Sequence, residues 1–367
     1  MSHQSDFTPL KRGANIGILG GGQLGRMLSI AASRLGFKTH IYSLSPNEPA
    51  MHVCASSTIG PYEDLDGVRD FAKSCDVVTY EFENVPELTA KAAMSSAPLR
   101  PGLTALATAQ DRLVEKTFLR DTAHVPVTRF EEVNNVFDLK RAVKRLGCPC
   151  VLKTRRFGYD GKGQSVIKSD ADIESAWTAI KEQPAILEGF VAFKREVSVI
   201  AARGRNGETA SYPLIENVHK NHILHTSTAP AEGASDKAKA YARDILEKLD
   251  YIGVIGVEFF EMENGELIVN EIAPRVHNSG HWTQDAGCID QFELHIRAIA
   301  GWPLGQIHLK HGVQMTNLIG SDIDALDSLA VEPDSFIHAY GKSEAREGRK
   351  MGHVNRIIHV PRGALNK

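Results

Sequence analysis

The sequence predicts an N-terminal α/β unit on a parallel sheet, then an α+β region and a small β-rich C-terminal segment. Three observations predict this organisation. Short apolar strands alternate with helical stretches early in the chain, glycine-rich connections join short strands from about residue 146, and Asn264-Gly265 separates two apolar strands. With 367 residues, the chain is long enough for two or three domains.

The parallel sheet is expected from several strands and one glycine-rich turn. Residues 14–19 form an apolar strand that ends in the glycine cluster at 20–25, and residues 26–34 follow as a helix. Residues 38–43 and 77–82 are further strands. Because strands and helices alternate, we expect a parallel α/β domain and place it at residues 1–112.

The second region combines helices with short strands. A helix at 111–122 carries Val114 and Phe118 on one face, and another is expected at 236–249. We place this α+β domain at residues 113–303, with a mobile lid at about 146–190, and a small β-rich domain at 304–367. Strands are expected at residues 151–154, 166–168, 185–188, 196–202, 254–262 and 266–272.

Composition excludes several classes of protein. Hydrophobic residues make up 42% of the chain, which excludes a disordered chain. The 42 basic and 45 acidic residues leave a net charge of −3, so no overall positive field indicates nucleic-acid binding. Five cysteines form no CxxC pair, and no stretch reaches the ~18 apolar residues of a membrane span. We therefore expect a cytoplasmic protein with neither a nucleic acid nor a membrane as partner.

The first glycine cluster fits G-x-G-x-x-G between a strand and a helix, a pattern typical of dinucleotide-binding proteins. Such proteins carry an acidic residue roughly 20 residues later for the ribose. Here residues 42–45 read YSLS, and the first acid is Glu48. The sequence therefore favours another phosphate or anion at this helix N-terminus. An NAD dehydrogenase stays open as the alternative.

A second glycine cluster follows a strand that ends at Lys153. Residues 155–164 read RRFGYDGKGQ, so glycines alternate with cations. Backbone N–H groups and positive charge in this arrangement can hold a polyphosphate, although the P-loop pattern is absent from the sequence. A solvated hairpin loop is the alternative for this segment alone.

The Asn264-Gly265 turn predicts a hairpin that places two carboxylates opposite each other. A two-residue turn gives the cross-strand pairs Glu258–Glu271, Phe260–Val269 and Met262–Leu267. Two carboxylates on one apolar face need a cation or a shared proton. Oxygen ligands of this kind suit Mg²⁺ held with substrate phosphates. A register slip that turns one Glu toward solvent is the alternative.

Polar side chains follow the second carboxylate directly. Residues 272–282 read IAPRVHNSGHW, so Arg275, His277 and Asn278 leave the hairpin together. We expect them to bind a reacting anion beside the metal, with an ordinary polar loop as the alternative.

Together these features resemble the ATP-grasp superfamily: a lysine-bearing strand, a glycine-rich flap, the strand ILEGFV and the Glu/Glu hairpin. Within it, residues 14–356 resemble the 5-(carboxyamino)imidazole ribonucleotide synthetases. The resemblance implies an ATP-grasp fold with an N-terminal Rossmann-like domain similar to that of biotin carboxylase. The sequence motifs that carry the resemblance are GGGQLGRML at 20–28, YEFENV at 80–85, DRLVEK at 111–116, GYDGKGQ at 158–164, NEIAPRVHNSGHWT at 270–283 and GRKMGH at 348–353.

The resemblance also implies residue roles. It makes Arg275 and Lys153 catalytic and gives Mg²⁺ the ligands Glu258 and Glu271. The ribonucleotide would meet Tyr159, Asp160, Arg275, His277 and Asn278, with Lys342 and Arg349 at its 5′-phosphate. ATP would meet Arg112, Lys153, Gly158, Tyr159, Asp160, Gly161, Lys162, Gly163, Gln164, Glu188, Gly189, Phe190, Val191, Glu196, His219, Asn270 and Glu271.

The implied reaction is ATP- and bicarbonate-dependent carboxylation of 5-aminoimidazole ribonucleotide in purine biosynthesis, by a homodimer without biotin or NAD. Bicarbonate attacks the γ-phosphate, and carboxyphosphate, or CO₂ released from it, then meets the exocyclic amine. Such chemistry is mostly positioning and charge neutralisation. One departure from many ATP-grasp enzymes is Ala273, where an Asn is usual two residues after the second metal Glu.

Several alternatives lead to different experiments. A formate-dependent glycinamide ribonucleotide transformylase also begins with an acyl phosphate. A biotin carboxylase is disfavoured, because we expect no biotin attachment domain. A nucleotide-sensing subunit without activity is disfavoured by the intact Lys153, Glu258 and Glu271. An NAD(P) dehydrogenase predicts nicotinamide binding and no effect of Glu258→Ala.

Overall fold

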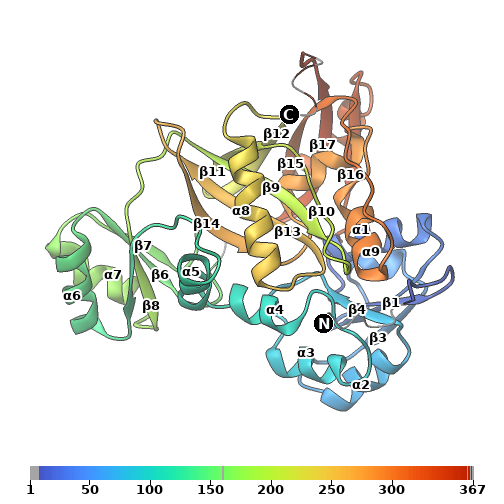
Figure 1. The fold of residues 1–367 in the computed structure, drawn as a ribbon, viewed down its shortest axis with the longest axis horizontal. Coiled ribbons are helices and arrows are strands. Elements are labelled where there is room, and N and C mark those ends of the chain that lie inside the picture. The colour runs from blue at the N-terminus through green and yellow to red at the C-terminus, as the bar shows by residue number, and fades with distance from the viewer. Residues whose placement is uncertain (1–7, 159–160, 362, 364, 366–367) are drawn as a thin grey trace.

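The computed structural model describes residues 8–158, 161–361, 363 and 365, so the predicted site residues Tyr159 and Asp160 lie outside the described residues. The described chain builds three β-sheets (Figure 1). One is a four-stranded parallel sheet, one is a nine-stranded sheet, and one is a four-stranded antiparallel sheet.

The N-terminal sheet has the order β3-β2-β1-β4, and every pair in it is parallel, which confirms the predicted α/β unit. Helix α1 begins at Gln23, inside the glycine cluster and three residues earlier than expected. The elements of this unit are β1 (Asn15–Leu19), α1 (Gln23–Arg34), β2 (Lys38–Ser43), η1 (Pro49–His52), β3 (Ser56–Ile59), α2 (Leu65–Lys73), β4 (Val77–Tyr80), α3 (Glu87–Met94) and α4 (Leu103–Ala109).

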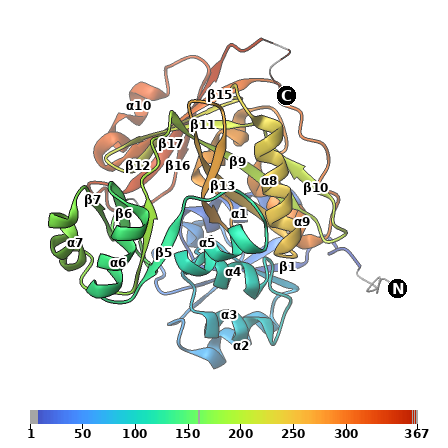
Figure 2. The same ribbon diagram turned by 60° about the vertical axis from the view of Figure 1, so that its left-hand side comes forward.

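The antiparallel sheet, in the order β5-β8-β6-β7, projects away from the rest of the molecule (Figures 1 and 2). Helices α6 and α7 pack on it, and Leu139 and Val143 of α6 share a core with Leu152 of β6. This unit therefore has a hydrophobic core of its own. Its elements are β5 (Phe130–Val133), α6 (Val136–Leu146), β6 (Cys150–Thr154), β7 (Gln164–Ile167), η2 (Asp170–Asp172), α7 (Ile173–Ala179) and β8 (Ala185–Gly189).

The nine-stranded sheet joins the middle and the end of the chain. Its order is β14-β13-β9-β11-β12-β15-β17-β16, with β10 paired to β9. Strands β15 and β17 continue the sheet through the β12–β15 pairing, so the β-rich C-terminal segment extends the central sheet. The strands are β9 (Arg195–Arg203), β10 (Thr209–Ser211), β11 (Ile215–Lys220), β12 (Ile223–Ala229), β13 (Gly253–Glu261), β14 (Leu267–Ala273), β15 (Gly312–Ile319), β16 (Ser335–Ala339) and β17 (Lys350–Ile358).

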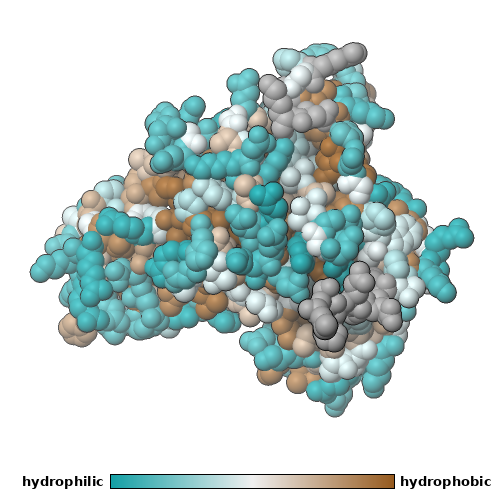
Figure 3. Space-filling view, in the orientation of Figure 1, coloured by the Kyte–Doolittle hydropathy of each residue, from teal (hydrophilic) through white to brown (hydrophobic). Residues whose placement is uncertain are grey.

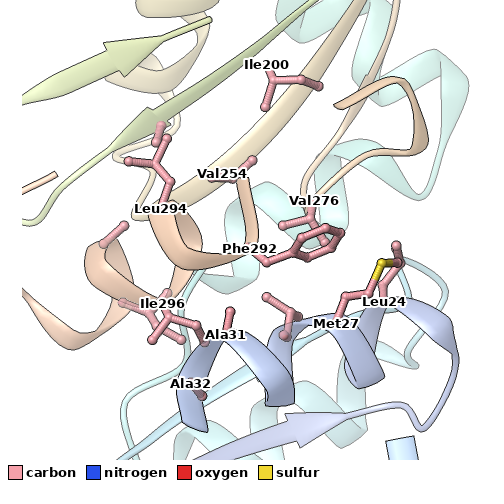
Figure 4. Packing of buried hydrophobic residues seen from close by; sticks show 14 of the residues in the cluster. Leu24, Met27, Ala31, Ala32, Ile200, Val254, Val276, Phe292, Leu294 and Ile296 are labelled. Carbon is pink, nitrogen blue, oxygen red and sulfur yellow. The ribbon is translucent and has the colours of Figure 1, made fainter. Parts of the chain in front are cut away.

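Helices surround this sheet and connect it to the N-terminal unit. Phe292 of α9 and Val276 pack against Leu24 and Met27 of α1, so one hydrophobic core joins the two parts (Figure 4). The remaining helices are α5 (Arg112–Asp121), α8 (Ser235–Lys248), η3 (Asn278–Asp285), α9 (Gln291–Ala300), η4 (Gly320–Ala325) and α10 (Leu326–Leu329).

The β13–β14 hairpin keeps the predicted carboxylate pair but not the predicted turn. Glu258 lies opposite Glu271, as expected. The turn is wrong by one residue: Met262 N–H donates to Glu266 O at 2.8 Å, and Gly265 adopts φ +79°, which is typical of a three-residue turn. The predicted pairs Phe260–Val269 and Met262–Leu267 are therefore wrong, and the structure has the pairs Phe259–Val269, Phe260–Ile268 and Glu261–Leu267.

A β-bulge restores the register at the site. The register shifts between Glu258 and Phe259, whose partners are Glu271 and Val269, so Asn270 is an extra residue on β14. Bulges commonly redirect a side chain next to an active site. Here the bulge places Asn270 directly beside the carboxylate pair.

Hydrophilic residues cover most of the face shown in Figure 3. Among the helices of the described residues, none combines the length and the apolar character that a membrane crossing requires.

Candidate active site

The centre of the site is the carboxylate pair on β13 and β14. Burial and the charge of Glu271 raise the pKa of Glu258. Burial also acts to raise the pKa of Glu271, but Arg112 Nη1, 3.0 Å from Glu271 Oε2, lowers it. The Glu271 side chain is 40% exposed, so a ligand can reach it from solvent. Two neighbouring carboxylates that repel each other fit a hard divalent cation such as Mg²⁺.

Arg112 joins this pair to the glycine-rich flap. Its Nη2 donates to Gly158 O at 3.3 Å. The preceding residue, Asp111, caps helix α5 through Leu113 N–H at 3.0 Å and accepts from Arg155 Nη2 at 2.8 Å. The start of α5 therefore fixes the first residues of the flap relative to Glu271.

Lys153 and Glu188 face each other across β6 and β8 of the projecting sheet. Lys153 Nζ lies 2.7 Å from Glu188 Oε2, and Lys116 Nζ of α5 lies 3.5 Å from Glu188 Oε1. Burial opposes ionisation of Glu188, but Lys116 and Lys153 hold its pKa at about 2. The Lys116 side chain is 1% exposed, and burial lowers its pKa. Two lysines from different parts of the fold therefore share one buried carboxylate.

Replacing Lys116 by Met is expected to destabilise the ligand-free protein by about 2–3 kcal/mol, because it removes one partner of a buried carboxylate while Lys153 keeps the other. Chemical denaturation measures the change. Lys140→Met is the matched control, since Lys140 makes an exposed ion pair with Glu174 on the same projecting unit and should cost less than about 1 kcal/mol. Equal losses in the two variants would contradict the role given to Lys116.

Glu115 of α5 lies close to the carboxylate pair, near enough for the charge of Glu271 to act on it. Its Oε1 accepts from Ile272 N–H at 2.7 Å, and the side chain is buried. Burial and then the charge of Glu271 raise the pKa of Glu115 to about 8. Helix α5 therefore turns Glu115 and Lys116 inward, whereas Val114 is 43% exposed.

This raised pKa predicts a pH dependence of stability. The folded state holds a proton on Glu115 that the unfolded chain releases near pH 4.5, so the stabilisation is present at low pH and is lost as pH rises toward about 8. From pH 7 to pH 8, the free energy of unfolding should therefore fall by about 1 kcal/mol more in the wild type than in Glu115→Gln. Denaturant titrations of both proteins at both pH values measure this, and groups that titrate alike in the two proteins cancel in the comparison. If the unfolding free energies of the wild type and Glu115→Gln differed by the same amount at pH 7 and pH 8, the prediction would be contradicted.

Arg275 is anchored by a residue of the N-terminal unit. Its guanidinium forms a two-pronged ion pair with Glu83, with Nη2–Oε1 at 2.8 Å. Burial acts against this charge pair, but Arg275 still holds the pKa of Glu83 at about 2. The pair joins residues 192 positions apart and brings Arg275 to the junction of the N-terminal unit and the hairpin.

The glycine cluster that resembles a dinucleotide motif is bound by a carboxylate of the chain itself. Glu81 Oε1 accepts from Gly22 N–H at 2.9 Å, and Oε2 accepts from Gly25 N–H at 3.3 Å. The predicted anion at the start of α1 is thus an internal one. A pyrophosphate would have to displace Glu81, which weakens the dehydrogenase alternative.

The remaining residues predicted to bind the ribonucleotide lie around the same junction. His277 Nε2 is 3.2 Å from Glu258 Oε1. Asn278 exchanges two side-chain hydrogen bonds with Asn317, at 3.0 and 2.8 Å. Lys342 Nζ donates to Lys350 O at 2.6 Å, and burial and then Arg349 lower the pKa of Lys342 to about 8. Two cations held near each other in this way fit an anionic group.

The remaining residues predicted to bind ATP lie on or next to the nine-stranded sheet and the projecting antiparallel sheet. His219 Nδ1 lies 3.0 Å from Glu196 Oε2, which raises the pKa of His219 against the effect of burial. Asn270 Oδ1 is buried and has no hydrogen-bond partner among the described residues, so a ligand could satisfy it. Gly158, Gly161, Lys162, Gly163 and Gln164 lie in or at the end of the flap between β6 and β7, and Gly189, Phe190 and Val191 lie at the end of β8.

Several charged residues of the site were missed. Glu83, Glu115, Lys116 and Lys350 are absent from the predicted set, yet each affects the pKa of a predicted site residue. All four lie inside sequence motifs that carry the family resemblance, namely YEFENV, DRLVEK and GRKMGH. The charged residues of these motifs were therefore the available signal.

Three family models match the chain. They are the ribonucleotide synthetase preATP-grasp domain at residues 14–110, the ATP-grasp domain at 118–292 and the phosphoribosylaminoimidazole carboxylase C-terminal domain at 314–362.

Whole proteins and solved structures match over nearly the full length. An N5-carboxyaminoimidazole ribonucleotide synthase of Brucella melitensis is 47% identical over 96% of this chain and 98% of its own, and one of Pseudomonas aeruginosa is 43% identical over 92% and 93%. An ADP complex of such a synthetase matches with a TM-score of 0.92 at 41% identity, over 97% of this chain and 96% of that one. An Aspergillus clavatus enzyme with ADP and 5-aminoimidazole ribonucleotide matches with a TM-score of 0.88 at 33% identity, over 96% of each chain. The chain therefore belongs to the N5-carboxyaminoimidazole ribonucleotide synthase family of ATP-grasp ligases.

Proposed function

We propose that this protein couples ATP hydrolysis to carboxylation of 5-aminoimidazole ribonucleotide, with bicarbonate as the carbon source and N5-carboxyaminoimidazole ribonucleotide as the product in purine biosynthesis. The observation that carries the proposal is the carboxylate pair Glu258–Glu271 beside Arg275, on the scaffold of this family. Relatives named for this product, and a neighbour holding ADP and the aminoimidazole ribonucleotide, support the same substrates.

The first step forms carboxyphosphate. An oxygen of bicarbonate attacks the γ-phosphorus of ATP, the bond from that phosphorus to the bridging oxygen breaks, and ADP leaves. Lys153 and the flap at residues 158–164 would hold the phosphates. Glu258 and Glu271 would hold Mg²⁺, which supplies charge neutralisation on the phosphates when bound. Because Lys116 keeps its contact with Glu188, Lys153 can turn toward a phosphate without leaving that carboxylate buried and unpaired.

The second step transfers the carboxyl group. The exocyclic amine of the ribonucleotide attacks the carboxyl carbon, the bond from that carbon to the phosphate oxygen breaks, and the amine loses a proton. If the carbon–oxygen bond of carboxyphosphate breaks first, the amine attacks the released CO₂ in the same place. Arg275, fixed by Glu83, would stabilise the negative charge of carboxyphosphate, and Lys342 and Arg349 would bind the 5′-phosphate.

The adenine contact is proposed for the chain after β8. Both carboxylate oxygens of Glu188 lie beside lysines. The backbone at Gly189, Phe190 and Val191 is therefore better placed than the Glu188 side chain to form hydrogen bonds with the edge of the adenine ring. Glu196, beside His219, would bind the ribose hydroxyls.

Three further expectations belong to this proposal. They are domain boundaries near residues 112 and 303, closure of a lid at about 146–190 over the nucleotide, and a cytoplasmic homodimer that uses neither biotin nor NAD. A closed lid would shield carboxyphosphate from water.

Phosphate release from MgATP, with and without bicarbonate and the aminoimidazole ribonucleotide, tests the function. Strong stimulation by the ribonucleotide that requires bicarbonate supports it. Stimulation by formate and glycinamide ribonucleotide would instead identify a transformylase. Absence of turnover with every acid would redirect attention to nicotinamide binding at the first glycine cluster.

A further inference from the structure

A chain of polar side chains crosses the nine-stranded sheet and ends at the carboxylate pair. It begins on β12, passes through β11 and β9, and reaches Glu258 through η3 and the residue before it. Four of its members are buried, with at most 6% exposed surface. In order, the members are Ser227, Asn217, Ser198, Ser279, His277 and Glu258.

The direction of this chain is fixed at its end near the site. Ser279 N–H lies 3.3 Å from His277 Nδ1. A backbone N–H can only donate, so Nδ1 must accept and carries no proton. An imidazole ring always keeps a proton on at least one nitrogen, so the proton of His277 is on Nε2. This nitrogen lies 3.2 Å from Glu258 Oε1.

The hydroxyl groups follow the same direction. Ser279 Oγ lies 2.9 Å from His277 Nδ1 and, because Nδ1 accepts, donates to it. Ser279 must then accept from Ser198, at 2.8 Å, and Ser198 accepts from Asn217 Nδ2, at 2.9 Å. Asn217 Oδ1 accepts from Ser227 at 2.8 Å. Each hydroxyl donates once and toward the site, so one consistent set of protons satisfies the whole chain.

The packing around the chain holds it in place. Val276, the residue before His277, is fully buried against Ile200 and Phe292 (Figure 4). Gln291 of α9 also accepts from His277 N–H at 2.9 Å and donates to His277 O at 2.7 Å. The backbone of His277 is therefore fixed independently of the hydroxyl chain, which leaves the orientation of the ring to Ser279 and the residues behind it.

We propose that Ser279, Ser198 and Asn217 are positioning residues that hold His277 as the Nε2–H tautomer, so that this ring is a fixed hydrogen-bond donor at the carboxylate pair and not a proton acceptor. The proposal rests on the proposed function for its chemical purpose. A donor at this position favours an oxyanion such as bicarbonate or carboxyphosphate beside Glu258, and it leaves the proton of the attacking amine to another group.

The tautomer can be measured without activity. Long-range ¹H–¹⁵N spectra of the ¹⁵N-histidine-labelled protein separate protonated from unprotonated ring nitrogens, and His277→Gln identifies the His277 signals by their loss. The expected result is an unprotonated Nδ1 and a protonated Nε2. A protonated Nδ1 would overturn the proposal, whatever the enzyme turns over.

Kinetics test whether the hydroxyls act as one chain. Ser198→Ala and Ser279→Ala are each expected to lower kcat of ribonucleotide-dependent phosphate release about tenfold, with KM for ATP nearly unchanged, as for other groups that orient a site residue. Because both act through the same ring, the double variant should lose little more than the more impaired single variant. A multiplied loss, on the order of a hundredfold, would overturn the proposal.

Ser29→Ala is the matched control. Ser29 is a buried serine of α1 whose hydroxyl has no hydrogen-bond partner among the described residues. Its removal should leave kcat unchanged, and combined with Ser279→Ala it should give the loss of Ser279→Ala alone. A loss in Ser29→Ala as large as that in the chain variants, at equal thermal stability, would show that any buried serine matters and would contradict the proposal. If the wild type releases no phosphate with this ribonucleotide, the proposed function fails while the tautomer result still decides the positioning role.

Discussion

Replacing Glu271 by Gln is expected to lower ribonucleotide-dependent ATP turnover roughly a thousandfold, the size of loss seen when a site loses a group that stabilises charge in the transition state. The substitution keeps the shape of the side chain and removes its charge. It removes half of the carboxylate pair and leaves Arg112 Nη1 without the carboxylate 3.0 Å away. Steady-state phosphate release at saturating MgATP measures the loss.

Glu266→Gln is the control for this experiment. Glu266 lies on the same hairpin but is exposed in the turn. It should keep near-wild-type turnover. Glu271→Gln relieves the repulsion on Glu258 but also removes the carboxylate partner of Arg112, so thermal unfolding without Mg²⁺ is measured to establish that the variant is folded. Full turnover in folded Glu271→Gln would refute the assignment of this pair.

Replacing Arg275 by Lys is expected to lower kcat about a hundredfold. A lysine keeps the charge but cannot form the two-pronged contact with Glu83, and it cannot present a planar fork to an oxyanion. Glu83 would also lose part of the two-pronged contact with the cation that holds its pKa at about 2. Phosphate release with bicarbonate and the ribonucleotide measures the loss.

Arg34→Lys provides the comparison for Arg275→Lys. Arg34 also contacts two carboxylates, Asp290 and Glu293, but its side chain is 52% exposed and lies on α1. The Arg34→Lys variant should keep wild-type activity, because an exposed ion pair contributes little to the stability of the fold. If Arg275→Lys lost no more activity than Arg34→Lys, Arg275 would have no role at the reacting anion.

The hairpin shows how far sequence reasoning reaches. The Glu258–Glu271 pair was predicted from a two-residue turn at Asn264-Gly265, and the pair is correct although the turn has three residues. The bulge at Asn270 compensates for the extra turn residue. Neither deviation is visible in the alternation of apolar residues, because a turn and a bulge that offset each other leave the pairing at the site unchanged.

Helix α5 shows where sequence reasoning ends. Apolar spacing places Val114 and Phe118 on one face of the helix, but Val114 is 43% exposed. Besides the apolar Leu119, the buried residues of this helix are the charged Glu115 and Lys116. They turn inward because Glu115 accepts from Ile272 N–H and Lys116 faces Glu188, and both partners come from distant strands. The Arg275–Glu83 pair, 192 residues apart, is equally invisible to local pattern. Polar contacts between residues far apart in the sequence depend on the whole fold. The periodicity of apolar residues in one segment therefore does not predict them.

Transfer of ¹⁸O from labelled bicarbonate is the most direct test of the central claim. If a bicarbonate oxygen attacks the γ-phosphorus, the released phosphate keeps that oxygen, whether the amine then meets carboxyphosphate or CO₂ formed from it. The account predicts one ¹⁸O in phosphate for each ¹³C-labelled carboxyl group found on the aminoimidazole ribonucleotide. Carboxylated product with unlabelled phosphate would contradict it, because water and not bicarbonate would then have cleaved the ATP.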